Sequence, residues 1–424
     1  MTGDTRLNAR SANASPDYVG PGYFGELRAN VRPLAAATIG IAFGMSINNY
    51  TASLFGAQLV SEFGWDRADF ALIGIFAIVL VPLFPIIGRI TDVKGVRWSA
   101  MIGVIGMPLT FFAQAWLNNG AIAVFFGISF LQLLTGAFLT STVFNRVVAE
   151  RFTLARGIAF AIIMSGPPIA GGIAAWMLGP VTAEWGWRGG YVMLGFIVGV
   201  FGVLALILLP AHVPPREQRP STLRRDFGTI ARHPVFWLAS LGMLLVNLPQ
   251  ALGSSQLMLM LQERGVALTA SIYLALYPAG VVVGRFVTGF ALDKFPTHIV
   301  GAIGLALPAL GFALLAAGIE APLVLGFAVL LMGLAQGAEG DVAAYAVARH
   351  FPVAIFASAM GLVNASTALG SALGSLALRP MLQTWGNFTP FLIFSAVATV
   401  IGAFALLAMG FYRESHAEPE EIHD

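Results

Sequence analysis

The chain has 424 residues, of which 57% are hydrophobic and only 10% are charged, and its mean hydropathy is +0.80. Soluble domains carry roughly 25% charged residues, so this composition excludes a soluble globular protein and indicates a membrane protein. A net charge of +2 without a run of basic residues argues against nucleic-acid binding, and the absence of cysteine excludes disulfides and thiolate metal sites.

Apolar segments that can cross a bilayer, which takes about 20 residues, alternate with short polar breaks along the chain. They are too long and too uniformly apolar for barrel strands, so helices are the spanning structure that fits. We predict an all-α membrane protein with twelve transmembrane helices. The predicted spans are 34–58, 69–88, 98–116, 120–146, 155–180, 189–211, 236–262, 270–292, 298–318, 321–349, 354–379 and 388–412.

The longest internal hydrophilic stretch runs from His212 to His233 and divides the spans into two six-helix bundles. We interpret this stretch as a solvated linker. An internal repeat supports the division, because Gly88-Arg-Ile-Thr-Asp92 and Gly289-Phe-Ala-Leu-Asp293 both follow the second span of their half. Two similar halves around a midplane site are a common plan of alternating-access transporters. The predicted parts are an N-terminal segment (1–32), a first bundle (33–211), a central loop (212–235), a second bundle (236–412) and a tail (413–424).

Basic residues favour one orientation in the membrane. If the N-terminus is cytoplasmic, eighteen of the 23 lysines and arginines lie on the cytoplasmic side. Only Arg67, Arg188, Arg264 and Arg379 then lie outside, and Arg285 is buried. Because cytoplasmic loops carry the excess of positive residues, we predict that both termini, the central loop and the tail are cytoplasmic.

Arg285 lies inside the predicted span 270–292, where no other side chain except tyrosine can ionise. A guanidinium stays charged, and placing it at the centre of a membrane helix costs roughly 2.5–3.5 kcal/mol. We therefore expect Arg285 to face an interior cavity and an anion. The alternative is a fixed ion pair with Glu339 or Asp341, the carboxylates that we place inside the tenth span. Either acid could instead couple proton movement to substrate binding, and the sequence does not select between them.

The segment Gly88–Arg97 reads Gly-Arg-Ile-Thr-Asp-Val-Lys-Gly-Val-Arg. It resembles the signature of the major facilitator superfamily in the loop between the second and third helices. The resemblance implies a cytoplasmic latch of Gly88, Asp92, Arg97 and Asp293 that stabilises the outward-open state. The glycines allow close helix packing, and Asp92 can accept hydrogen bonds from a helix end or an arginine. The alternative is that the segment only packs and orients its loop.

Several further motifs resemble bacterial monocarboxylate-transporter-like proteins of this superfamily. The resemblance implies that Arg285 is the carboxylate ligand. The fifth-span pattern departs from the group at Ala161 and at Pro167-Pro168, and the eleventh span lacks the lysine of oxalate–formate exchangers, which disfavours a dicarboxylate exchanger. The motifs are Phe63-Gly-Trp-Asp-Arg67, Arg156-Gly-Ile-Ala159, Trp185-Gly-Trp-Arg188 and Gly337-Ala-Glu-Gly-Asp341.

Other polar residues inside spans are candidates to line the cavity. We select Asn48, Tyr277 and Asn364 as substrate-binding residues beside Arg285, on their span and depth. For each of these, and for Gln132 and Asn247 as well, hydrogen bonding between helices is the alternative role.

The sequence thus predicts a secondary transporter of a small organic anion, most simply a proton-coupled monocarboxylate symporter in the lipid bilayer. A proton-driven drug or metabolite exporter and an organic-anion exchanger are the alternatives, and a membrane sensor is a further one. We predict no enzyme activity, cofactor, metal site or nucleic-acid partner. The resemblance implies a monomer in a bacterial inner membrane.

Overall fold

The computed structural model describes residues 22–65, 76, 78–118, 120–210, 223–250, 252, 257, 260, 270–319 and 321–412. These residues form helices and short turns, and no strand occurs among them. The helices of the first half are α1 (Tyr23–Ala29), α2 (Val31–Ala42), α3 (Met45–Phe63), α5 (Leu80–Lys94), α6 (Val96–Ala115), α7 (Ile122–Gly136), α8 (Ser141–Arg151) and α9 (Arg156–Leu208). Those of the second half are α10 (Leu223–Arg232), α11 (Pro234–Asn247), α13 (Ala270–Lys294), α14 (Thr297–Ala316), α15 (Pro322–His350), α16 (Phe356–Trp385) and α17 (Thr389–Ala408).

Many of these helices can cross a membrane. Within the described ranges, seven helices are long and apolar enough on their own. An eighth span results if α10 and α11, which are bent by 75° relative to each other, are taken together. The start of the predicted second span and the end of the predicted seventh span lie outside the described residues.

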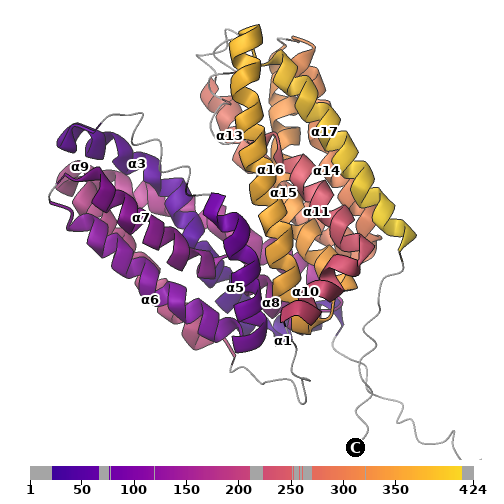
Figure 1. Ribbon diagram of the computed structural model, residues 1–424, viewed down its shortest axis with the longest axis horizontal. Helices are drawn as coiled ribbons and strands as arrows, with labels where there is room; N and C mark the ends of the chain where they lie inside the picture. The colour runs from indigo at the N-terminus through magenta and orange to yellow at the C-terminus, as the bar shows by residue number, and fades with distance from the viewer. Residues whose placement is uncertain are drawn as a thin grey trace, which may run out of the picture.

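The helices gather into two bundles that meet at one end of the molecule and stand apart at the other (Figure 1). Across the boundary between the bundles, α5 packs on α16 and α9 packs on α13. We call the end where the bundles meet the latch end. There α5 ends at Lys94, α9 begins at Arg156, α13 ends at Lys294 and α16 begins at Phe356.

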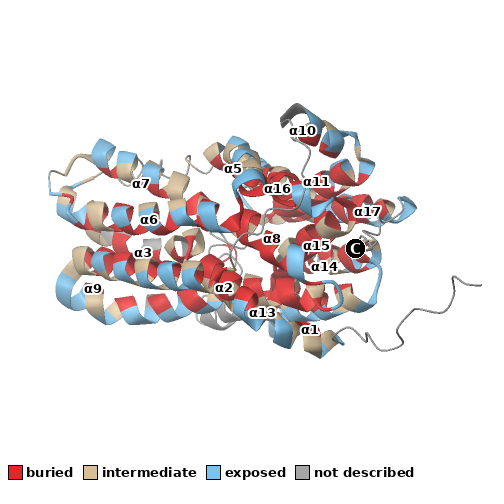
Figure 2. Ribbon diagram, turned by 90° about the horizontal axis from the view of Figure 1, so that it is seen from below, coloured by how far each residue is buried: buried red, intermediate tan, exposed pale blue. Residues whose placement is uncertain are grey.

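One apolar core joins both bundles near the latch end. It includes Ile87 and Ala161 of the first bundle and Val342 of the second. A smaller core around Phe391 lies in the second bundle, away from the latch end. Exposed residues lie on the outer faces of the helices (Figure 2). Many of them are large and apolar, for example Phe404, as expected where lipid replaces water.

Two of the predicted spans are interrupted. Span one consists of α2 and α3, which are separated at Gly44, and span four consists of α7 and α8, which are separated at Thr140. The two breaks pack together, because a Cβ on Gly44 would lie 2.2 Å from the carbonyl oxygen of Leu139. Spans five and six instead form α9, whose helical backbone is broken at Gly186 with φ +64°, a conformation that glycine adopts readily.

A short helix lies in each of the two segments that the sequence predicted to be hydrophilic. Helix α1 falls within the N-terminal segment, and α10 falls within the central loop. On α10, Ile230 is fully buried and Asp226 forms an ion pair with Arg89 of α5, whereas Arg225 and Arg232 are exposed. Within the stretch interpreted as a solvated linker, Asp226 and Ile230 are therefore docked against the bundle and not solvated. The i, i+4 spacing of Asp226 and Ile230 gives this helix one face that docks.

Candidate functional site

The N-terminus of α16 binds Asp92, the carboxylate near the end of α5. The backbone N–H groups of Ala357 and Ser358 donate to its two oxygens at 3.0 and 2.7 Å, and Arg146 of α8 forms an ion pair with it. Asp92 and Arg146 are both buried. A carboxylate at a helix N-terminus satisfies free N–H groups and is favoured by the helix dipole. This contact therefore ties the first bundle to the second.

Asp293, the repeat counterpart of Asp92, makes a similar contact at the N-terminus of α9. The N–H groups of Gly157 and Ile158 donate to it at 2.5 and 3.1 Å, and the hydroxyl of Tyr23 donates at 2.8 Å. Burial raises the pKa of Tyr23 above its ordinary value, and the Asp293 carboxylate raises it further, so the hydroxyl keeps its proton and donates. The second bundle is thereby tied to the first.

Helix α1 is held at the same end of α9 by a third carboxylate, that of Glu26. This buried group accepts hydrogen bonds from the N–H groups of Thr153, Leu154 and Ala155 at 2.7, 2.9 and 2.7 Å. Because Tyr23 of the same helix contacts Asp293, α1 touches both bundles.

Glycines bring the paired helices into backbone contact at the latch end. A Cβ on Gly88 would lie 2.1 Å from the carbonyl oxygen of Ala357, and a Cβ on Gly157 would lie 2.2 Å from that of Gly289. Any side chain there would push two helices apart. Arg97, by contrast, is exposed and forms no ion pair or hydrogen bond within the described part of the chain.

We predict that Asp92→Asn leaves the protein in the membrane but lowers its turnover. The amide N–H₂ would face the donors that the carboxylate now accepts from, and leaving them unpaired costs roughly 1–3 kcal/mol. The measurement is the transport rate per molecule at equal abundance in the membrane. The exposed Glu184→Gln at the opposite end is the control. Equal turnover of Asp92→Asn and wild type would show that the segment only packs its loop.

Gly157→Ala is expected to loosen the latch end. The new methyl group would meet the Gly289 carbonyl and the Asp293 carboxylate at 2.2 and 2.8 Å, and such overpacking costs roughly 1–3 kcal/mol. The chain contains no cysteine, so spin labels on two introduced cysteines, one at the end of α5 and one at the start of α16, report the separation of these two sites directly. The expected result is a larger population with a long separation. Gly172→Ala on the same helix is the control, because nothing lies within 4 Å of its Cβ.

Deeper in the second bundle, Arg285 of α13 faces Asp341 of α15. Arginine Nη1 lies 3.7 Å from aspartate Oδ1, which is close enough for an ion pair but too far for a hydrogen bond. The side chain of Asp341 is completely buried, and that of Arg285 is 12% exposed. Neither oxygen of Asp341, nor Nε or Nη1 of Arg285, forms a hydrogen bond within the described residues. The pair therefore keeps unused hydrogen-bonding capacity in the interior.

Glu339 has a different environment. Its oxygens accept hydrogen bonds from Asn247 of α11 and Gln336 of α15, both at 3.0 Å. The hydroxyl of Tyr277 donates in turn to Gln336 at 2.8 Å. This network joins three helices of the second bundle, and each oxygen of Glu339 accepts one hydrogen bond within it.

Arg285 also lies near the boundary with the first bundle. A Cβ built on Gly340 would be 3.0 Å from the methyl group of Met164 on α9 and 3.9 Å from Nη1 of Arg285. A side-chain end of the first bundle thus lies close to the arginine head group. This position agrees with a site between the two bundles.

The other predicted residues are dispersed. Asn364 of α16 donates to Thr142 of α8 at 2.8 Å, so it connects the bundles. Asn48 is half-buried on α3 and forms no hydrogen bond within the described chain. Gln132 forms a buried amide pair with Gln114 of α6, at 3.3 and 3.4 Å, which is a contact between helices. The structure therefore brings Arg285 near Asp341, and it places Tyr277 in the network of Glu339.

Sequence reasoning missed several polar residues at this interface. The partner of Asp92 is Arg146, and the amide that links Tyr277 to Glu339 is Gln336. Asn145 of α8 is completely buried, and neither of its amide atoms has a hydrogen-bond partner in the described chain. For Gln336, a polar residue in an otherwise apolar span was the available signal.

Comparison with known proteins decides the family. The model of the Major Facilitator Superfamily matches residues 34–339 and 260–423, which together cover most of the chain. The chain belongs to the major facilitator superfamily. The prediction of twelve helices in two six-helix bundles is thereby confirmed, and the protein is a multi-pass membrane transporter.

The chain is similar to individual transporters at low sequence identity. The MFS transporter asaE of Aspergillus flavus is 25% identical over 343 residues, which cover 76% of this chain and 73% of that protein. The human organic anion transporter MFSD10 has a TM-score of 0.71 at 15% identity, over 89% of this chain and 99% of that one. The Escherichia coli fucose:proton symporter FucP has a TM-score of 0.69 at 15% identity, over 90% and 98%. The monocarboxylate-transporter-like group and a bacterial origin stay predictions.

Proposed function

We propose that this member of the superfamily transports a small organic anion, most simply a monocarboxylate, together with a proton. The observation that carries the proposal is Arg285, whose buried Nε and Nη1 atoms have no hydrogen-bond partner although Asp341 lies nearby. Buried donors without partners are costly, and a bound carboxylate would satisfy such a donor with a charge-assisted hydrogen bond.

The chemistry of arginine supports an anionic substrate. Its planar fork matches a carboxylate bidentately, and burial makes such a charge-assisted contact stronger than in water. The ion pair with Asp341 does not use that fork well, because the 3.7 Å separation is longer than a hydrogen bond. A substrate carboxylate can therefore replace Asp341 as the partner of Arg285. The fold is also that of a human organic anion transporter.

The two acids of α15 differ in a way that favours Asp341 as the proton carrier. Glu339 accepts two hydrogen bonds from amide donors, whereas neither oxygen of Asp341 accepts any within the described chain. A buried carboxylate without donors is stable as an anion only beside a cation. When substrate takes Arg285, Asp341 loses that cation and binds a proton. Substrate and proton would then move together, and the fold is also that of a proton symporter.

The latch end supports alternating access as the mechanism. If the latch end is cytoplasmic, as the basic residues predict, the contacts of Asp92 and Asp293 close that side and the structure corresponds to the outward-open state. Loading of the central site would favour closure on the other side and release of the latch. The substrate would then leave into the cytoplasm.

The test is uptake of a panel of radiolabelled carboxylates into proteoliposomes, with and without an inward proton gradient. We expect uptake of at least one monocarboxylate that the gradient stimulates. Gradient-independent exchange against an internal carboxylate would favour the organic-anion exchanger. If no carboxylate moves while cationic or neutral compounds are expelled, the anion proposal is wrong and the exporter replaces it.

A further inference from the structure

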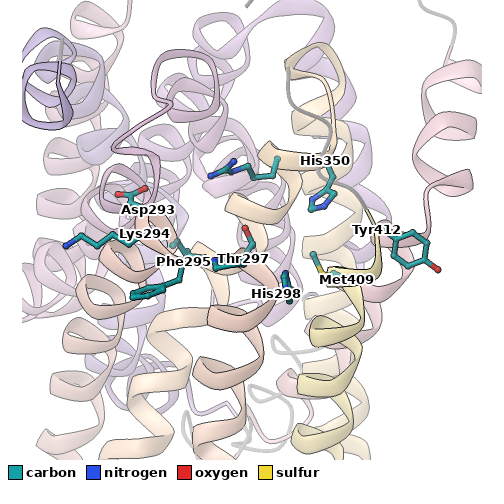
Figure 3. Close-up of a pocket in the computed structure, with 12 residues that line it drawn as sticks. Asp293, Lys294, Phe295, Thr297, His298, His350, Met409 and Tyr412 are labelled. Atoms are coloured by element: carbon teal, nitrogen blue, oxygen red, sulfur yellow. The ribbon is translucent and has the colours of Figure 1, made fainter. Parts of the chain in front are cut away.

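A cavity of about 490 Å³ lies at the latch end of the second bundle, apart from the Arg285 site. It is formed where α13 ends, α14 begins, α15 ends and α17 is followed by a short turn (Figure 3). Four side chains that are cationic or can become so line it, namely Lys294, His298, Arg349 and His350. We call this cavity the basic pocket.

The acidic residue that lines the basic pocket, Asp293, already has hydrogen-bond donors outside the pocket. Asp293 accepts hydrogen bonds from two N–H groups of α9 and from Tyr23. The first turn of α14 adds positive potential, since its N-cap residue Pro296 offers no side-chain acceptor to the free N–H groups of Thr297 and His298. The surroundings of the pocket therefore favour an anion.

His350 supplies a buried polar atom that lacks a partner. Its ring is 5% exposed, and Nδ1 lies 2.9 Å from the carbonyl oxygen of Ala346. Because a carbonyl only accepts, Nδ1 carries the proton and Nε2 is the atom left without a hydrogen bond in the described chain. Figure 3 shows this ring beside His298 and Met409 in the pocket. When protonated, Nε2 can donate to a phosphate oxygen.

Space for the second imidazole depends on a glycine. A Cβ on Gly410 would lie 2.6 Å from Cδ2 of His298, so the turn after α17 accommodates the ring only because position 410 has no side chain. The ring of His298 is half-buried there.

A separate apolar groove of about 390 Å³ lies on the outer face of the bundle, and its lining begins at Ile299, the residue after His298 of the basic pocket. It lies between α14 and α17, the two helices whose ends border the pocket. Its lining includes Ile299 and Ile303 on α14 and Phe404 and Leu407 on α17, and it contains almost no polar surface. Phe411, which lies in the chain between the lining residues Gly410 and Tyr412, is 89% exposed, as expected for an aromatic residue at a membrane interface.

We propose that the basic pocket and the apolar groove together bind one anionic phospholipid, with the phosphate headgroup in the pocket and an acyl chain in the groove. The phosphate headgroup would contact the positive groups of the basic pocket, namely Lys294, Arg349, the two histidines and the start of α14. The acyl chain would pack against the apolar residues that line the groove. Basic pockets between transmembrane helices are a recognised way of holding acidic headgroups. The ligand contacts the end of α13, so it occupies the side of the latch that contains Asp293.

Native mass spectrometry of the detergent-solubilised full chain tests the proposal, with phosphatidylglycerol and phosphatidylcholine added in equal amounts. We expect selective retention of phosphatidylglycerol. Lys294→Gln should weaken retention about fivefold, as the loss of one cation near a phosphate predicts. His350→Phe should also weaken retention, because it removes the imidazole nitrogen that faces the pocket. Lys94→Gln is the matched control, because Lys94 ends α5 as Lys294 ends α13 but does not line the pocket.

Three outcomes would overturn the proposal: equal retention of both lipids, equal weakening by Lys94→Gln, or no weakening by Lys294→Gln. Lys294 is exposed, so its variant folds even if His350→Phe does not. Millimolar inorganic phosphate is tested in parallel by thermal stability. If it stabilises wild type but not Lys294→Gln, while phosphatidylglycerol is not retained, the pocket binds a soluble phosphate and the lipid assignment is wrong.

Discussion

Arg285→Gln is expected to reduce carboxylate uptake into proteoliposomes about 10- to 100-fold. The substitution keeps a polar but shorter side chain and removes the charge and the bidentate fork. A hydrogen bond to a charged group contributes roughly 1.5–3 kcal/mol, which corresponds to this range of rate or affinity. Carboxylate uptake by Arg285→Lys should lie between that of wild type and that of Arg285→Gln, because lysine restores the charge without the planar geometry.

The control for this experiment is Arg379→Gln, which removes an exposed arginine of α16 and should transport like wild type. Correct folding of Arg285→Gln is checked by its elution as a single species and by its thermal stability. If Arg285→Gln transports carboxylates normally, the arginine is only a structural partner of Asp341 and the substrate site lies elsewhere.

Asp341→Asn is expected to separate substrate movement from the proton gradient. Asparagine has nearly the shape of a protonated aspartic acid, so the variant resembles the loaded form permanently. Accumulation of substrate driven by the gradient should be lost. Exchange of internal for external substrate, which needs no net proton transfer, should stay within about twofold of wild type. Both quantities are measured on the same proteoliposomes.

Glu339→Gln provides the comparison, because Glu339 accepts hydrogen bonds from Asn247 and Gln336. Glutamine can accept only at one of its two terminal atoms, so this variant should lose thermal stability but keep its response to the gradient. The reverse pattern, in which Glu339→Gln is uncoupled and Asp341→Asn responds normally, would assign the proton to Glu339.

Hydropathy and the internal repeat were sufficient to predict the twelve helices and their two bundles, because membrane spans need long apolar segments. They did not predict the breaks at Gly44 and Thr140, since these depend on one helix fitting against another. They also missed α10, whose docking surface is a single face of one short polar segment.

The candidate site was predictable where burial of a charge is costly. A charged residue in an apolar span is costly and therefore noticeable, which singled out Arg285, Asp341 and Glu339. In the structure, Nη1 of Arg285 lies 3.7 Å from Oδ1 of Asp341. Arg146 was not singled out, because it lies near a span end where arginine is ordinary. The hydrogen bond from Asn364 to Thr142 depends on how the two bundles approach each other. No local sequence pattern encodes that approach.

We expect helix α1, at the beginning of the described chain, to take part in the conformational change of the transport cycle. It is fixed to the first bundle by four hydrogen bonds that Glu26 accepts, and it touches the second bundle through the hydroxyl of Tyr23. When the latch releases, α1 should stay with α9 and lose its contact with Asp293. An environment-sensitive fluorophore attached at Phe24, which is 79% exposed, would therefore change its emission once per transport cycle. The same position would serve poorly for immobilising the protein, because a surface anchor there would hinder the opening of the latch.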